Sequence, residues 1–222
     1  MSKVFAIGFQ KTGTTSLGRA LALLGYSVCG YDPFRKLLRI ENLGMEPILD
    51  LALSLADRHD AFKDTPWPVL YRELDQRYPG SKFILTVRDT DKWIRSVVND
   101  FGAHPNAIHT AIYGCPFPRG HEQAWIDRYE RHNAEVLEHF RDRPQDLLAL
   151  HLDRGEVRWE AVCPFLGRDV PNTPWPHANK RRDKKFRMFV GRWAARMRLA
   201  PTPDERANRE FAADAPPRPG AQ

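Results

Sequence analysis

The 222-residue sequence has few cysteines and lacks several features that would define a class of protein. Its three cysteines, Cys29, Cys115 and Cys163, lie far apart, without CxxC or Cys/His ligand spacing, so we predict reduced thiols and no metal site. No apolar run approaches the roughly 18 residues that span a bilayer. The chain begins with a predicted strand instead of a signal peptide, so we expect a cytoplasmic protein.

The composition predicts one globular α/β domain with an excess of positive charge. Hydrophobic residues make up 42% of the chain, which is enough for a core, and the formal net charge is +6. This excess suits an anionic ligand or a membrane surface, although a solvated basic tail explains it equally well. No nucleic-acid partner is expected, and the sequence does not determine the oligomeric state.

A glycine-containing loop, Gly8-Phe-Gln-Lys-Thr-Gly-Thr-Thr-Ser16, lies between an apolar run and a helical pattern. Such a strand–loop–helix unit directs backbone N–H groups and a helix N-terminus toward an anion. Gly8 and Gly13 have the spacing of a Walker A loop, but the lysine position of that motif holds Thr14, and Lys11 precedes the second glycine. The loop is therefore predicted to bind phosphate or a similar group, and the missing lysine argues against ATP hydrolysis.

Strand and helix patterns alternate along the chain. Strands are predicted at 4–7, 26–29, 61–63, 82–87 and 147–152. Helices are predicted at 17–24, 33–44, 46–57, 67–78, 92–101, 121–141 and 157–166, with an irregular insert or lid at 102–119. This order predicts a doubly wound parallel sheet of about five strands, flanked by helices and similar to P-loop NTPases.

Two details of these helices are predicted from side-chain chemistry. Asp91 is expected to cap the helix that begins at Lys92, and Leu137 is expected on the inward face of the helix 121–141, together with Trp125, Tyr129, Val136 and Phe140.

The C-terminal part divides into three segments. Prolines make 170–179 irregular, and residues 184–199 have the pattern of a basic amphipathic helix. Residues 200–222, rich in Pro, Ala and charge, are expected to be disordered. We predict a single domain at 1–199, with the basic helix packed on it; contact of that helix with an anionic membrane is the alternative, which would make the protein peripheral at a membrane.

In a parallel sheet the carboxyl ends of the strands share one edge, where ligands bind. Gly8, Asp64, Arg88 and Asp153 all follow predicted strands. Arg88 is followed eight residues later by Ser96 on the next helix, and a guanidinium with a nearby hydroxyl can grip a second phosphate.

The segments Gln10–Ser16 and Lys82–Ser96 resemble the two phosphate motifs of sulfotransferases that use 3′-phosphoadenosine-5′-phosphosulfate (PAPS). That family's 5′-phosphosulfate loop commonly reads Pro-Lys-(Ser/Thr)-Gly-Thr-(Thr/Ser), so Gln10 replaces a proline. The likeness runs from residue 3 to about 180 and is strongest to a bacterial-type subgroup with an acidic residue after the third strand, here Asp64, and a Pro-rich segment ending in Asn179.

The resemblance implies transfer of a sulfuryl group from PAPS to a hydroxyl or amine of a small-molecule, glycan or lipid acceptor, releasing adenosine 3′,5′-bisphosphate and requiring no metal. Lys11 would stabilise the leaving phosphate and Asp64 would be the base. The implied donor-binding residues are Lys11, Thr12, Gly13, Thr14, Thr15, Ser16, Arg88 and Ser96. Lys180 and Arg181 are expected to replace an Arg-Lys-Gly…Gly-Asp-Trp-Lys segment that the chain lacks.

Other interpretations stay open. The histidines at positions 59, 104, 109 and 177 are rival bases, and Asp64 can equally be a structural residue. A kinase with Mg²⁺ held by Thr15 and Asp153 or Asp89, and a non-catalytic nucleotide-binding scaffold, are the alternative functions. The acceptor site is expected in the inserts 30–60 and 100–125.

Overall fold

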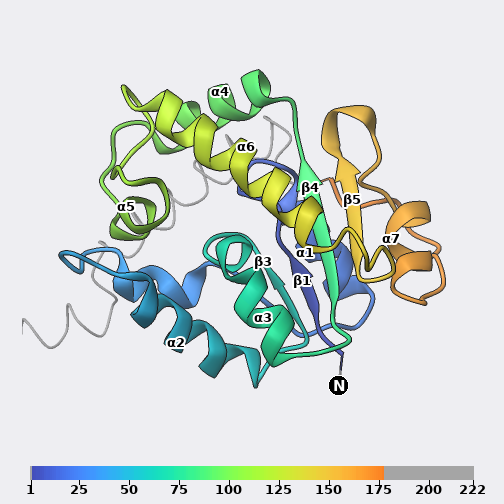
Figure 1. Cartoon of the computed structure of the whole chain (residues 1–222). Coiled ribbons are helices and arrows are strands. Elements are labelled where there is room, and N and C mark those ends of the chain that lie inside the picture. The colour runs from blue at the N-terminus through green and yellow to red at the C-terminus, as the bar shows by residue number, and fades with distance from the viewer. Residues whose placement is uncertain (1, 178–222) are drawn as a thin grey trace, which may run out of the picture. The chain divides into compact units, whose positions relative to one another are not determined.

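The computed structural model describes residues 2–177 of the chain (Figure 1). Its strands are β1 (Val4–Ala6), β2 (Val28–Cys29), β3 (Ala61–Lys63), β4 (Lys82–Val87) and β5 (Leu147–His151). Its α-helices are α1 (Thr14–Leu23), α2 (Met45–Ala56), α3 (Tyr71–Arg77), α4 (Thr90–Phe101), α5 (Ala107–Tyr113), α6 (Glu122–His139) and α7 (Trp159–Phe165). Three 3₁₀ helices complete this part: η1 (Asp32–Leu37), η2 (Trp67–Leu70) and η3 (Leu152–Arg154).

The five strands form one parallel sheet in the order β2-β3-β1-β4-β5. Strand β1 is central, so that Phe5 is paired with Phe62 on one side and with Phe83 on the other. From β1 the chain first builds β2 and β3 on one side and then crosses to β4 and β5. The order of the strands thus reverses at β1, and a ligand site is expected at its carboxyl end. The predicted doubly wound α/β fold is confirmed.

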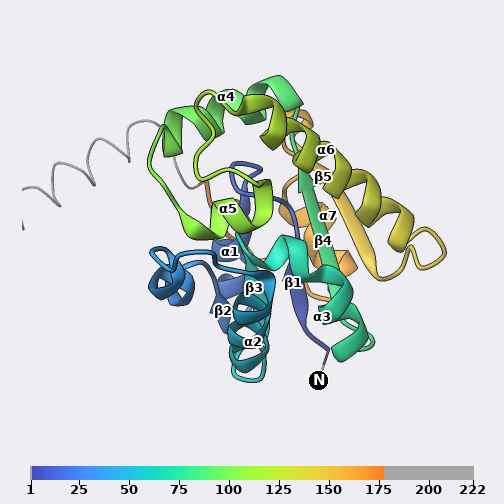
Figure 2. The ribbon, with the colours of Figure 1, turned by 60° about the vertical axis from the view of Figure 1, so that its left-hand side comes forward.

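Alternate residues of the central strand pack into two separate cores. Phe5 belongs to the larger core with residues of α2 to α6, whereas Val4 and Ala6 pack with Leu17 and Leu21 of α1 and Val162 of α7. Helices therefore cover both faces of the sheet, as Figures 1 and 2 show from two directions. This arrangement explains why β4 is apolar along nearly its whole length.

Most predicted elements occur close to their expected positions, and β3 and β4 have the predicted bounds. Four local predictions are wrong. The segment 33–44 contains only the 3₁₀ helix η1, and 67–78 is divided into η2 and α3. The insert 102–119 contains helix α5, whose first N–H groups bond the side chain of Asn106. Helix α4 begins one residue before Asp91, so Asp89 takes the N-cap position without a side-chain hydrogen bond.

The inward face of α6 also differs from the prediction. Trp125, Tyr129 and Val136 are buried, but the side of the helix at Leu137 faces solvent, because that residue is 50% exposed. Across residues 2–177, no helix is long and apolar enough to cross a membrane. The predicted basic helix at 184–199 and the tail at 200–222 lie outside the described residues.

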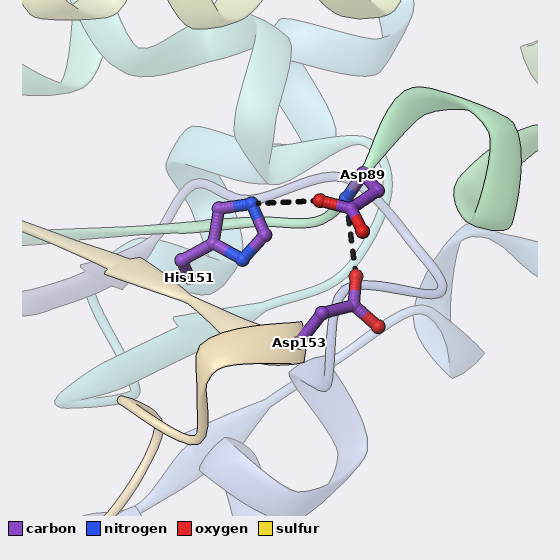
Figure 3. A group of neighbouring side chains, drawn as sticks. All are labelled: Asp89, His151 and Asp153. Atoms are coloured by element: carbon purple, nitrogen blue, oxygen red, sulfur yellow. Dashed lines mark hydrogen bonds and ion pairs between the residues drawn. The ribbon is translucent and has the colours of Figure 1, made fainter.

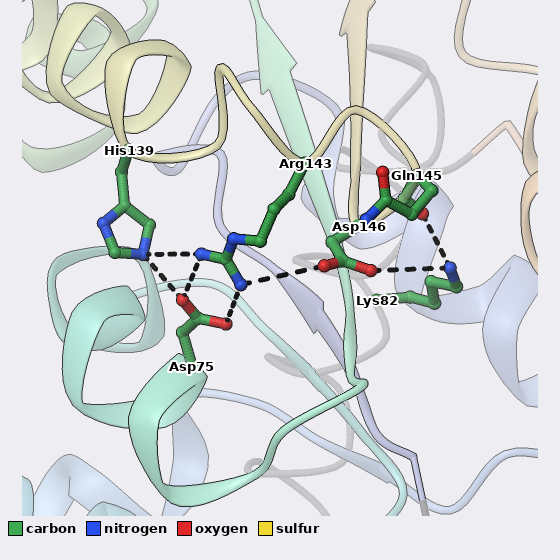
Figure 4. A network of polar contacts seen from close by, with 6 residues as sticks. All are labelled: Asp75, Lys82, His139, Arg143, Gln145 and Asp146. Atoms are coloured by element: carbon green, nitrogen blue, oxygen red, sulfur yellow. Dashed lines mark hydrogen bonds and ion pairs between the residues drawn. The ribbon is translucent and has the colours of Figure 1, made fainter.

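A polar network joins α3, the end of α6 and the turn before β5 (Figure 4). Asp75 accepts hydrogen bonds from both terminal nitrogens of Arg143, at 2.6 and 3.0 Å, and from His139 at 2.7 Å. Burial would raise the pKa of Asp75, but these hydrogen bonds and charges lower it below its ordinary value. The same guanidinium lies 3.7 Å from Asp146, which pairs with Lys82 at the start of β4. The network therefore fixes α6 against the sheet.

Two histidines are buried as neutral side chains. His132 of α6 is fully buried, and its Nε2 donates to the carbonyl of Ile7 at 2.8 Å. His109 of α5 is 4% exposed and bonds the carbonyl of Pro116. Burial lowers the pKa of each to about 4, from an ordinary value of 6.5, more than these hydrogen bonds raise it.

We predict that the free energy of unfolding falls as the pH is lowered from about 6.5 to about 4. In this window His109 and His132 bind protons in the unfolded chain but stay unprotonated in the folded chain. Each histidine can remove up to about 1.4 kcal/mol per pH unit. Urea denaturation at pH 7.0, 6.0 and 5.0 measures the slope. A wild-type stability that is flat between pH 7 and 5 would contradict the prediction.

Candidate functional site

The loop between β1 and α1 ends at a helix N-terminus that no side chain caps. Gly13 occupies the N-cap position with a φ of 98°, and the first turn of α1 contains no acidic residue. The free N–H groups of a helix N-terminus and the positive end of its dipole attract anions. The first turn of α1, with Thr14, Thr15 and Ser16, follows the loop that leaves the carboxyl end of the central strand.

Strand β4 holds this loop at both ends. A Cβ atom on Gly8 would lie 2.1 Å from Oγ1 and 2.4 Å from the carbonyl oxygen of Thr86, so only glycine fits there. The hydroxyl of Thr12 lies 2.7 Å from the hydroxyl of Thr86 and donates to the carbonyl of Phe9 at 2.6 Å. The Thr12 hydroxyl is therefore buried and occupied by bonds within the protein.

Lys11 has a left-handed backbone, with a φ of 71°. Its ammonium group lies 3.1 Å from Oδ2 of Asp100, a residue near the end of α4. The Lys11 and Asp100 side chains are 21% and 26% exposed, so solvent reaches the ion pair. Asp100 lies 89 positions after Lys11, and no pattern in the sequence connects the two.

Arg88 follows β4 and reaches back to the same loop. The hydroxyl of Tyr129 on α6 accepts from the N–H of Arg88 and donates to its carbonyl, both at 2.8 Å. The guanidinium Nη1 lies 3.5 Å from the carbonyl of Lys11, and Nε lies 3.6 Å from Oδ1 of Asp153. The buried Nε has no hydrogen-bond partner among the residues that the structure describes. The fold thus brings the arginine predicted to bind the second phosphate next to the loop predicted to bind the first.

Asp64 lies on the other side of the central strand, after β3, and also has a left-handed backbone, with a φ of 71°. Its Oδ1 accepts from the N–H of Thr65 at 3.0 Å, and its Oδ2 lies 3.8 Å from the ammonium of Lys63. The stem of Lys63 passes over Gly18 and Gly30, where an added Cβ would lie 3.1 Å from it. These two glycines leave room for the Lys63 side chain beside Asp64. No pattern in the sequence indicates that Lys63 and Asp64 pair.

Asp89, His151 and Asp153 form a compact polar group at the ends of β4 and β5 (Figure 3). Nε2 of His151 lies 3.2 Å from Oδ1 of Asp89, and Asp153 accepts from the N–H of Asp89 at 3.1 Å. Their ligand atoms lie within 4.8 Å of one another, close enough to surround a cation. Lys92 already lies 2.8 Å from Asp89 and 3.5 Å from Asp153, so side-chain cations balance this charge.

Three further residues were predicted at the donor site: Ser96, Lys180 and Arg181. Ser96 is partly buried on α4, two turns after Arg88. Lys180 and Arg181 lie outside the described residues. Sequence reasoning missed Asp100 and the backbone clamp of Tyr129; the apolar pattern of α6 indicated only that Tyr129 faces inward.

Comparison with known proteins gives two matches. The family model described as "Sulfotransferase domain" matches residues 3–119 and 101–184, which include both predicted phosphate motifs. The protein named "Ava biosynthesis cluster protein M" from Aspergillus versicolor is 26% identical over 145 residues. That match covers 54% of this chain and 54% of the Aspergillus protein, so the chain spans about half the length of its curated relative.

We predict that Gly8→Ala sharply destabilises the protein, because the new methyl group would overlap both the side chain and the backbone of Thr86. Overpacking of this kind costs about 1–3 kcal/mol, and more where backbone must move. Thermal unfolding measures the loss. Gly44→Ala is the control for a methyl group without a clash, because nothing lies within 4 Å of the added Cβ and its φ is −82°. Since Gly44 is the N-cap of α2, a smaller loss of up to about 1 kcal/mol is expected there. Equal stability of the two variants would show that the loop does not press on β4.

Proposed function

The chain belongs to the sulfotransferase-domain family, and on this basis we propose that it transfers a sulfuryl group from PAPS to a hydroxyl or amine. The observation that carries the proposal is the uncapped N-terminus of α1 at the end of the central strand, with Lys11 and Arg88 beside it. This arrangement offers one backbone cradle and two cations to a doubly phosphorylated nucleotide.

The donor's 5′-phosphosulfate would lie on the backbone N–H groups of Thr12 to Ser16, with the hydroxyls of Thr14 and Thr15 beside it. Arg88 would bind the 3′-phosphate, since its backbone is clamped by Tyr129 and its guanidinium already points to the loop. Ser96, and Lys180 and Arg181 beyond the described residues, are proposed as further contacts to that phosphate.

In the proposed reaction the bond between sulfur and the bridging phosphate oxygen breaks as a new bond forms between sulfur and the acceptor oxygen or nitrogen. Negative charge develops on the bridging oxygen of the departing adenosine 3′,5′-bisphosphate. Lys11 would exchange Asp100 for this oxygen and stabilise the charge. A sulfuryl group carries less charge than a terminal phosphate, so side-chain cations can replace the Mg²⁺ of phosphoryl transfer.

The acceptor's proton would pass to Asp64. Its place at the end of β3, next to the loop, supports this role. The rival histidines are less suited: His109 is buried and bonded to Pro116, His59 lies 2.8 Å from the hydroxyl of Ser27, and His104 lies 3.0 Å from the carbonyl of Phe101. The fourth, His177, is on the exposed Pro-rich segment.

The acceptor would lie between the two inserts, 30–60 and 100–125. These segments touch: the side chain of Asn106 donates to the hydroxyl of Tyr31 at 3.0 Å, and the N–H of Ala107 donates to the carbonyl of Leu38 at 3.1 Å. The proposed acceptor is a small molecule, a glycan or a lipid with a hydroxyl or amine.

Calorimetric titration with adenosine 3′,5′-bisphosphate and, separately, with ATP and Mg²⁺ tests the proposed donor. We expect binding of the bisphosphate without Mg²⁺. A panel of acceptor classes incubated with labelled PAPS then tests transfer. Preferential binding of ATP with Mg²⁺ would favour a kinase, and bisphosphate binding without turnover of PAPS would favour a non-catalytic scaffold.

We predict that Arg88→Ala weakens binding of adenosine 3′,5′-bisphosphate by about 1.5–3 kcal/mol, the scale of a charged hydrogen bond. Binding of adenosine 5′-phosphate, which lacks the 3′-phosphate, should change far less. Arg95→Ala, at an exposed position on α4, is the matched control for loss of one positive charge. Equal losses for both nucleotides would place Arg88 away from the 3′-phosphate.

We predict that Lys11→Ala and Asp64→Asn both reduce transfer while the protein remains folded. Loss of a transition-state contact such as that of Lys11 costs about 10²- to 10³-fold in rate. Asp64→Asn should bind PAPS like the wild type and fail only at transfer, because its role begins at the acceptor. Single-turnover rates with labelled PAPS measure both effects, and normal transfer by folded Asp64→Asn at neutral pH would assign the base to another residue.

A further inference from the structure

The side chain of Gln10 is buried at the centre of the site and bonded at both ends. Its Nε2 donates to the hydroxyl of Tyr113 on α5 at 2.7 Å, and its Oε1 accepts from the hydroxyl of Thr65 at 2.6 Å. The indole N–H of Trp93 on α4 donates to its backbone carbonyl at 2.9 Å. Gln10 is 5% exposed and Thr65 is 3% exposed, so water does not compete for these bonds. One glutamine thus joins the anion-binding loop to three other elements.

The bond between Gln10 and Thr65 connects the immediate neighbours of the two proposed catalytic residues. Gln10 precedes Lys11, and Thr65 follows Asp64. Both Lys11 and Asp64 have a φ of 71°, a left-handed conformation that is strained for a non-glycine residue and persists only where the surroundings enforce it. The hydrogen bond links these two enforced turns across β1 and β3.

We propose that Gln10 and Thr65 are positioning residues that set the placement of Lys11, at the donor, relative to Asp64, at the acceptor. The inference rests on the proposed sulfuryl transfer. In-line transfer requires the sulfur, the attacking atom and the base to be aligned, and a displacement of about 1 Å can cost about 10²-fold in rate. A direct hydrogen bond of 2.6 Å between the two turns limits such displacement.

A purely structural role makes a different prediction. Loss of the Thr65 hydroxyl leaves the buried Oε1 of Gln10 without its donor and lowers the Tm in either case. Stability alone therefore does not distinguish the two roles. If Gln10 and Thr65 position the catalytic residues, loss of their bond lowers kcat while donor binding is retained. If they only stabilise the fold, kcat per folded molecule stays unchanged.

The test compares Thr65→Val, which removes the hydroxyl from a side chain of similar shape, with Thr65→Ser, which retains it. The assays are calorimetric binding of adenosine 3′,5′-bisphosphate and steady-state transfer from labelled PAPS to the acceptor found in the panel, well below each variant's Tm. We expect Thr65→Val to bind the bisphosphate within about threefold of wild type and to lose about 10- to 100-fold in kcat. Thr65→Ser should restore kcat to within about threefold of wild type.

Two control variants separate positioning from general destabilisation. Tyr113→Phe removes the bond at the other end of the same buried amide and leaves the Gln10–Thr65 bond, so it should lose stability but much less kcat. Thr110→Val removes an exposed hydroxyl of α5 and should change neither quantity. If Thr65→Val does not fold, Thr65→Ala removes the same hydroxyl with less steric demand.

Three results would overturn the inference: wild-type kcat in Thr65→Val, equal kcat losses in Thr65→Val and Tyr113→Phe, or loss of bisphosphate binding in proportion to kcat. Failure of the proposed function is distinguishable from these, because the wild-type protein itself would then neither bind the bisphosphate nor turn over PAPS.

Discussion

The contact between Gly8 and strand β4 determines where the loop after β1 and the uncapped start of α1 lie. With no side chain at Gly8, the loop after β1 lies directly on Thr86, and the hydroxyl of Thr12 bonds that same threonine from the far part of the loop. His132 holds the carbonyl of Ile7 just before the loop. Lys11 and Gly13 in this loop have left-handed backbone conformations. The loop then leads into the uncapped start of α1 at the carboxyl edge of the sheet. The position of the proposed anion site therefore follows from backbone packing, with Lys11 and Arg88 placed beside it.

Three basic side chains beside that loop, within residues 2–177, each pair with an aspartate: Lys11 with Asp100, Arg88 with Asp153, and Lys63 with Asp64. Partly exposed ion pairs of this kind contribute only about 0–1 kcal/mol each. A charged hydrogen bond to a phosphate contributes more, about 1.5–3 kcal/mol. A phosphorylated ligand can therefore take Lys11 and Arg88 from their aspartates at small cost, while the aspartates reduce repulsion among the cations when no ligand is bound.

The sequence predicts the sheet well because its determinants are local. Apolar runs such as 82–87 mark buried parallel strands, and the glycine spacing from Gly8 to Gly13 marks the loop between β1 and α1. From strand ends alone, Asp64 and Arg88 are expected at the same edge of the sheet, where the structure has them. The predictions fail where a structure depends on a residue far away in the sequence or on a single capping side chain. Helix α5 depends on the Asn106 cap within a segment rich in glycine and proline, and the pairing of Lys11 with Asp100 depends on how α4 packs over the loop.

The replacement of a proline by Gln10 has a structural consequence beyond the loop itself. Proline would restrict the backbone but has no side-chain hydrogen bond to offer. Glutamine instead binds Tyr113 of α5 and Thr65 after β3. Helix α5 also bonds the insert that contains η1, through Asn106 and Tyr31. The loop after β1, the strand end with Asp64 and the two inserts proposed to hold the acceptor are thus joined by direct hydrogen bonds.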